Sequence, residues 1–283
     1  MTLVAVALLA ALASAGLWLL ARPVFSAPVL QRTNHRGASV PVAAGVLLVV
    51  AVLATEALLT VAQTLGRDPE VGEQSGRTAV LIATLGFGLL GAFDDLAAHG
   101  DDRGFRGHVT SLLRGRLTTG GLKLAGGGLL AIVVVGATGE DRFGRLMLGA
   151  GVVALGANLG NLFDRAPGRT TKVALLAGAV LVAATSASER PTLIATVAVL
   201  GAGIGLLVPD LRESLMLGDA GANVLGAAVA TGMVATTGAV AQLVALVVLV
   251  ALNLLSEVVS FSRLIDDFAP LRALDRLGRR PSR

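Results

Sequence analysis

Two adjacent carboxylates, Asp94 and Asp95, come at the end of an apolar run, Thr78 to Leu90, that is typical of a membrane-buried helix. Ionisable groups inside a bilayer or at its edge are energetically costly. The C-terminus of a helix, where its dipole is negative, disfavours acids a second time. A bound cation would offset both costs, so the pair indicates a divalent-metal site if other oxygen ligands reach the same place.

Three other predicted helices carry acids or amides near one end. These residues are Asn158, Asn161 and Asp164 on the first, Asp219 on the second, and Asn253 with Glu257 on the third. In the first set, the spacing of three residues places all three side chains on one helix face. Structural alternatives exist for each: Asp219 could cap its helix, the asparagines could hydrogen-bond between helices, and Asp164 could pair with Arg165 or Arg169.

The segments near these acids are rich in basic residues. Arg114 and Arg116 occur in a loop with Gly and Thr, and Arg169 and Lys172 closely follow Asp164. Arginines, hydroxyls and glycine-exposed backbone amides suit a cradle for phosphate groups. The alternative is an ordinary basic loop that contacts anionic lipid headgroups. Composition leaves both interpretations open.

The composition is that of a membrane protein. Of the 283 residues, 54% are hydrophobic and 15% are charged, whereas a soluble domain carries roughly a quarter charged residues. The absence of cysteine excludes disulfides and thiolate-ligated metals, and the three histidines are too scattered for a zinc site. The net charge of +4 implies no nucleic-acid partner, because basic loops are the usual orientation signal of membrane proteins. The excess of arginine over lysine suggests a GC-rich bacterial genome.

We predict an all-α fold: one polytopic membrane domain over residues 1–283 with about nine transmembrane helices. A span needs about 20 apolar residues, and candidate runs occur at 2–21, 40–65, 78–95, 121–138, 144–163, 172–187, 191–208, 217–236 and 239–261. The loops at about 22–39, 96–120, 164–171 and 209–216 and the tail 262–283, with both lysines at helix edges, hold 18 of the 23 Lys and Arg residues. The positive-inside rule places these segments in the cytoplasm, with the N-terminus outside and the tail inside.

This topology brings the acids and amides of four helices to their cytoplasmic ends. The helix boundaries depend on hydropathy and not on the positions of these acids. Their shared location is therefore an independent indication of a functional site at the cytoplasmic face of a bacterial plasma (inner) membrane. Glu56 falls in the outer half of its helix. It is therefore expected to be protonated or hydrogen-bonded, with no part in catalysis.

With these residues in place, the chain resembles the polyprenyl-phosphate N-acetylhexosamine-1-phosphate transferase superfamily, the MraY-like and WecA-like enzymes of glycosyltransferase family 4. Four landmarks occur in the family's order between about residues 32 and 225. They are Arg36-Gly37 with Val40-Pro41 and Gly45, Gly91 with Asp94-Asp95, Asn158 with Asn161 and Asp164, and the turn Met216-Leu217-Gly218-Asp219-Ala220-Gly221.

The resemblance implies transfer of a sugar-1-phosphate from a UDP-sugar to polyprenyl phosphate in cell-wall biogenesis, with Mg²⁺ or Mn²⁺ as cofactor. By the same resemblance, the metal ligands are Asp219 with Asp95 or Asp94, and Asp164 binds metal or substrate. The resemblance also implies that Lys123, Arg114 and Arg116 bind the lipid phosphate and that the amides of Asn158 and Asn161 line the cleft. Further substrate contacts are expected from Arg36, Arg169 and Lys172. A homodimer follows by analogy with the family.

The chain departs from the family pattern after Asp164, where Pro167 stands in place of a second acid, and it lacks a late His-rich loop. These departures motivate an alternative of another class: a catalytically silent member that binds lipid phosphate or nucleotide as a scaffold or regulator of envelope assembly. A transporter is a third hypothesis, but such proteins are built from internal repeats or paired broken helices, and the sequence shows no convincing repeat.

Overall fold

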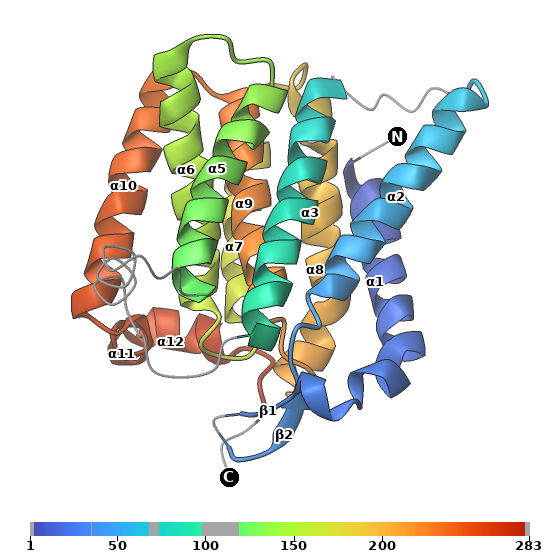
Figure 1. The fold of residues 1–283 in the computed structure, drawn as a ribbon, viewed down its shortest axis with the longest axis vertical. Helices are drawn as coiled ribbons and strands as arrows, with labels where there is room; N and C mark the ends of the chain where they lie inside the picture. Colours follow the sequence, from blue (N-terminus) through green and yellow to red (C-terminus); the bar gives the residue numbers. More distant parts are fainter. Residues whose placement is uncertain (1–2, 35, 68–73, 98–118, 281–283) are drawn as a thin grey trace.

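The computed structural model describes residues 3–34, 36–67, 74–97 and 119–280. Within these ranges, nine long helices alternate in direction along the bundle (Figure 1). They are α1 (Leu3–Phe25), α2 (Val46–Thr64), α3 (Gln74–Ala97), α5 (Thr119–Ala137), α6 (Phe143–Phe163), α7 (Arg169–Ala184), α8 (Ile194–Leu211), α9 (Asp219–Thr236) and α10 (Ala239–Val258). Each corresponds to one of the nine predicted helices, and the fold is all-α apart from one small hairpin.

Seven of the described helices are long and apolar enough to cross a membrane: α1, α2, α3, α5, α6, α8 and α10. Their length and composition indicate a multi-pass membrane protein. The other two long helices differ for simple reasons. Helix α7 has only 16 residues, and α9 is dominated by small residues and lies mostly buried.

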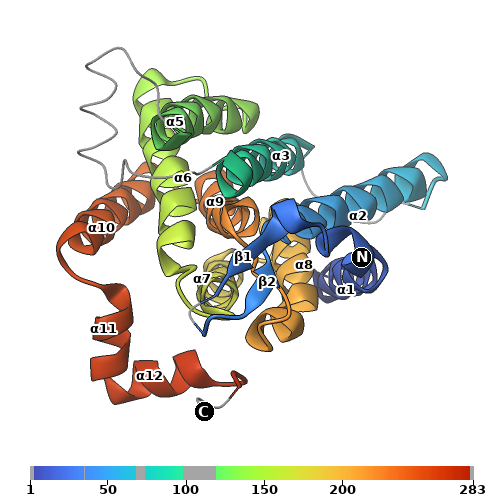
Figure 2. The same cartoon turned by 60° about the horizontal axis from the view of Figure 1, so that its bottom comes forward.

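Helix α9 forms the centre of the bundle, between α3, α6 and α8 (Figure 2). Its approach to α6 is close because glycines face each other. A Cβ at Gly160 would overlap the backbone carbonyl of Ala222, and one at Gly226 would overlap the carbonyl of Gly156. Small residues at helix interfaces allow such approach in lipid, where dispersion contacts replace the hydrophobic effect as the source of association.

The predicted start of the second helix, at residue 40, is wrong. Strands β1 (Gln31–Thr33) and β2 (Ser39–Pro41) form an antiparallel hairpin there. A residue before proline is sterically biased to extended backbone, which favours a strand at Val40. The hairpin is joined to the turn before α9, because the Met216 N–H donates to the Pro41 carbonyl at 2.7 Å.

The last predicted helix, 239–261, ends earlier, at Val258. Two short helices follow in the predicted tail, α11 (Phe261–Asp267) and α12 (Ala269–Arg276). They run crosswise to the long helices at the lower end of the bundle (Figure 2). Two 3-10 turns, Pro28–Leu30 and Arg190–Leu193, complete the described elements.

At the opposite end of the bundle from this tail, α2 and α3 share a buried ion pair. The Arg77 guanidinium donates to Glu56 Oε2 from Nη2 at 2.6 Å and from Nε at 3.1 Å. Glu56 is thus hydrogen-bonded, as expected from its position in the sequence.

Candidate functional site

Lys123, near the start of α5, is the centre of a polar cluster at the lower end of the bundle. Its ammonium forms an ion pair with Asp219, and its Nζ lies 3.5 Å from Asp94 Oδ2. The Asn161 amide completes the cluster in the orientation assigned from its hydrogen bonds: its nitrogen donates to Asp219 Oδ1 at 2.6 Å and its oxygen accepts from Lys123 at 2.9 Å. Side chains from α3, α5, α6 and α9 therefore meet around one cation.

The two adjacent acids of α3 have different surroundings. Asp95 Oδ1 accepts the backbone N–H of Asp219 at 2.9 Å, and Oδ2 accepts that of Ala220 at 3.1 Å. The first N–H groups of a helix have no partner within the helix, and a negative charge there is favoured by the helix dipole. Asp95 therefore caps α9 from another helix, while Asp94 turns to Lys123.

This arrangement excludes the alternative in which the Asp219 side chain caps its own helix. The N-cap residue is Gly218, and no side chain of the cap position makes a hydrogen bond. The Asp219 carboxylate instead contacts Lys123 and Asn161. Helix capping does not explain this acid.

Two glycines allow α3 and α9 to come this close. A Cβ at Gly91 would overlap the backbone carbonyl of Asp219. Gly218 has φ +66°, a left-handed conformation that side chains disfavour, and a Cβ there would lie 2.5 Å from Asp95 Oδ2. Both positions are thus required by the contact that places Asp219.

Asp164, the residue at the C-cap of α6, lies near enough to Asp219 and Asp95 to feel their charges. Burial raises the pKa of Asp164 well above 3.8, and the negative charges of Asp210 and Asp219 raise it further. Within the described ranges Asp164 makes no ion pair with Arg165 or Arg169, so the local-pair alternative finds no support there. These neighbouring acids favour the neutral form of Asp164 unless a further cation, such as a bound metal ion, joins Lys123 at the site.

Asp210 is an acid that the sequence analysis missed. It lies in the last turn of α8, and its Oδ2 accepts the Gly168 N–H at 2.9 Å, which fixes the turn after Asp164. The predicted helix ended at residue 208 and so left Asp210 in a loop. The sequence feature that could have identified Asp210 is its place directly after Pro209, at the same end of the bundle as the other acids.

A cavity of about 460 Å³ opens beside Lys123, between α3, α5, α6, α9 and α10. Most of its lining is apolar, from residues such as Phe87, Leu124 and Val250. Its polar lining consists of Lys123, Asn158, Asn223, Asn253 and Glu257. A largely apolar cavity with a cation beside it suits an amphiphile with an anionic head.

The amide side chains that line this cavity differ in their hydrogen-bond partners. Asn158 Nδ2 donates to Asn253 Oδ1 at 2.6 Å, so the predicted hydrogen bond between helices is present and joins α6 to α10. The same two side chains line the cavity, so the hydrogen bond between helices is compatible with a substrate contact by Asn158, which stays a prediction. Asn223, which is 2% exposed, carries an Oδ1 atom without a partner among the described residues.

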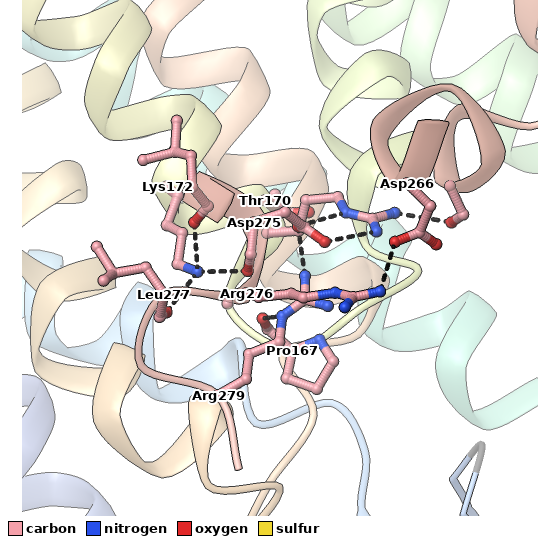
Figure 3. Close-up of polar contacts among 12 residues, drawn as sticks. Pro167, Thr170, Lys172, Asp266, Asp275, Arg276, Leu277 and Arg279 are labelled. Carbon is pink, nitrogen blue, oxygen red and sulfur yellow. Dashed lines mark hydrogen bonds and ion pairs between the residues drawn. The ribbon is translucent and has the colours of Figure 1, made fainter. Parts of the chain in front are cut away.

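The remaining predicted substrate ligands are not brought to Lys123. Arg36 pairs with Glu213 at 3.0 Å. Arg169 and Lys172 bind the tail: Arg169 pairs with Asp275 at 2.8 Å, and Lys172 Nζ donates to three carbonyls around the end of α12 (Figure 3). The predicted phosphate ligands Arg114 and Arg116 lie outside the described residues.

The donors around Lys123 fit a hard divalent cation. Carboxylate and amide oxygens are the ligands that Mg²⁺ prefers, and Asp94, Asp219 and Asp164 outnumber the single lysine. Both Asp95 oxygens already accept backbone N–H groups, which favours Asp94 as the partner of Asp219 in metal binding. Across the described ranges, no three acids or histidines already converge at metal-ligand spacing.

The sequence matches no model of a known protein family, and no curated protein matches it either. The functional proposals below therefore depend on the geometry of the site and on the motifs in the sequence.

Proposed function

We propose that the protein is a phosphoglycosyl transferase that moves a sugar-1-phosphate from a UDP-sugar to polyprenyl phosphate at the cytoplasmic leaflet. The observation that supports this most directly is the Lys123 cluster. Oxygen ligands from three helices surround one lysine, and that lysine also lines a 460 Å³ apolar cavity. A charged centre beside an apolar cavity suits a reaction between a membrane lipid and a soluble nucleotide.

In the proposed reaction an oxygen of the lipid phosphate forms a bond to the β-phosphorus of the UDP-sugar. The bond from that phosphorus to the oxygen shared with the α-phosphate breaks, and UMP leaves with that oxygen. The phosphate oxygen is already ionised, so the attack needs no general base. Phosphoryl transfer of this kind depends mostly on positioning and on neutralising charge.

The side chains of the site divide these tasks. Lys123 exchanges its carboxylate partners for the lipid phosphate, which enters from the apolar cavity. Asp219 and Asp94 would hold Mg²⁺, and Asp164 would share in this or orient the nucleotide. When bound, the metal supplies positive charge that neutralises the diphosphate. Asp95 keeps Asp219 in place by capping its helix.

The test is release of UMP by the purified protein in detergent, with polyprenyl phosphate, Mg²⁺ and a panel of UDP-sugars. We expect release that needs both lipid and metal and that falls by at least about 100-fold in Asp219→Asn, a loss typical of removing a group that stabilises the transition state. Asp141→Asn is the matched control, because Asp141 is an exposed acid of the opposite end of the bundle. Equal activity in wild type and Asp219→Asn would refute the role of this carboxylate.

One observation favours a second function, a scaffold or regulator without catalysis. Two basic residues expected to bind substrate, Arg169 and Lys172, are occupied by the protein's own tail. In addition, Pro167 stands where the family pattern has an acid. This alternative predicts binding of polyprenyl phosphate, weakened by Lys123→Met, with no UMP release for any sugar of the panel.

A further inference from the structure

The tail that follows α10 is amphipathic and exposed. Large apolar side chains recur along α11 and α12: Leu264 is 42% exposed, Phe268 58%, Leu271 46% and Leu274 41%. A soluble surface seldom carries a row of such residues without a partner. Figure 2 shows this segment at the edge of the bundle, crosswise to the helices that are apolar enough to span a membrane.

The tail is attached to the helix bundle through Asp275, which binds a side chain of α7. This carboxylate is 7% exposed, and its two oxygens accept from one edge of the Arg169 guanidinium, from Nε at 2.8 Å and from Nη2 at 3.0 Å. Arg279 also pairs with Asp275, and its Nε donates to the Pro167 carbonyl at 3.0 Å. Because the buried Asp275 carboxylate needs both arginines as partners, these contacts fix the orientation of α12 against the bundle.

Lys172 holds the same C-terminal end of α12. Its ammonium donates to the carbonyls of Leu274, Asp275 and Leu277 at 3.2, 2.7 and 2.8 Å. The last carbonyls of a helix lack partners within the helix and carry its negative dipole charge. The position of Lys172 is therefore that of a cap supplied from α7.

With Asp275 pointing into the bundle, the two flanks of α12 differ. Leu271 and Leu274 are three residues apart and share one flank, whereas Arg272 and Arg276 are four apart and share the other. The Arg276 side chain is 65% exposed and pairs with Asp266 of α11 at 3.1 Å. Arg272 Nη1 donates to the Asp266 carbonyl at 2.6 Å, so both guanidinium groups lie beside the exposed part of α11. A helix with one apolar flank and one cationic flank is typical of segments that lie in the headgroup region of a membrane.

We propose that α11 and α12 form an interfacial anchor that lies in the headgroup region of the bilayer, where its arginines bind phosphates of anionic lipids. The end of α10, with its exposed apolar residues Leu254, Leu255 and Val258, directly precedes these helices in the chain. Arginine stems bury against apolar surface while their heads remain at the polar boundary. The partner is thus the bilayer that holds α10, and the inference does not depend on the proposed reaction.

The absence of cysteine makes the anchor easy to probe in the full-length protein. Single cysteines at Leu271→Cys and Leu274→Cys report on the apolar flank, and Ala273→Cys, an exposed position between them, reports on the far side of α12. Each is labelled with an environment-sensitive NBD fluorophore and placed in nanodiscs of phosphatidylglycerol or phosphatidylcholine. Quenching is measured with a lipid brominated near the headgroup and, separately, with iodide in the water phase.

We expect the brominated lipid to quench the labels at positions 271 and 274 at least about twofold more than the label at 273, and iodide to show the reverse order. The lipid quenching should be stronger in phosphatidylglycerol, because each arginine near an anionic surface favours binding by about fivefold. Equal exposure of all three labels to iodide would overturn the proposal. Shielding of positions 271 and 274 from iodide without lipid quenching would also overturn it, because protein would then cover this flank. Equal quenching in both lipids would overturn the assignment of anionic phosphates as the ligands of the arginines.

Discussion

Asp94 and Asp95 are adjacent acids of the same type, and the structure predicts that their replacement has very different effects on stability. Asp95→Asn keeps one acceptor oxygen but places an amide NH₂ against a backbone N–H of the first turn of α9. Hydrogen bonds to a charged group contribute about 1.5–3 kcal/mol each, and a buried donor left unpaired costs about 1–3 kcal/mol. We therefore expect Asp95→Asn to lower the free energy of unfolding by about 2–3 kcal/mol.

Asp94→Asn is the matched control. Its side chain is 21% exposed, and its nearest cation, Lys123 Nζ, is 3.5 Å away, a contact of the kind that contributes at most about 1 kcal/mol. The free energy of unfolding of both variants can be measured by titrating the protein from a mild detergent into SDS while following helicity. Equal destabilisation by the two substitutions, or none by Asp95→Asn, would refute the assignment of Asp95 as the cap of α9.

Three further predictions concern other contacts. Gly91→Ala forces α3 away from α9 and should cost about 1–3 kcal/mol, whereas Gly128→Ala, whose Cβ would meet no atom within 4 Å, should be nearly neutral in the same titration. Arg77→Met leaves Glu56 buried and unpaired and should cost about 3–5 kcal/mol, while the double variant Arg77→Met with Glu56→Leu should cost less than the single one; an additive result would contradict the pairing. Burial alone would raise the pKa of Asp275, but the hydrogen bonds and charges of its arginine partners outweigh burial and lower it below 3.8. The contribution of Asp275 to stability is therefore complete above about pH 4 and is lost as the pH falls through the lowered pKa, so wild type should lose its advantage over Asp275→Asn only below about pH 4.

The helical architecture could be predicted from the sequence because each helix is encoded by its own apolar run. The lengths of those runs and the alternation of basic loops also indicated which ends lie together. Asp94, Asn161 and Asp219 were placed at one end of the bundle on this basis, and the structure brings their side chains to Lys123. Local pattern was sufficient for these features.

Contacts between distant segments could not be predicted in this way. The cap of α9 by Asp95 joins residues more than a hundred positions apart, and so does the contact of Arg169 with Asp275. Spacing along one helix carries no information about such pairs. The sequence analysis therefore assigned Asp95 to the metal and Arg169 to substrate, whereas the structure engages both in holding other elements in place.

The most direct test of the proposed function is to follow the β-phosphate itself. UDP-sugar labelled with ³²P at the β position is incubated with the purified protein, polyprenyl phosphate and Mg²⁺, and the lipid is extracted into butanol. The proposed transfer predicts that label enters the lipid fraction in step with UMP release, and that it does so in Asp141→Asn but not in Asp219→Asn. Label that stays entirely in the aqueous fraction, with the protein folded and polyprenyl phosphate bound, would contradict phosphoglycosyl transfer.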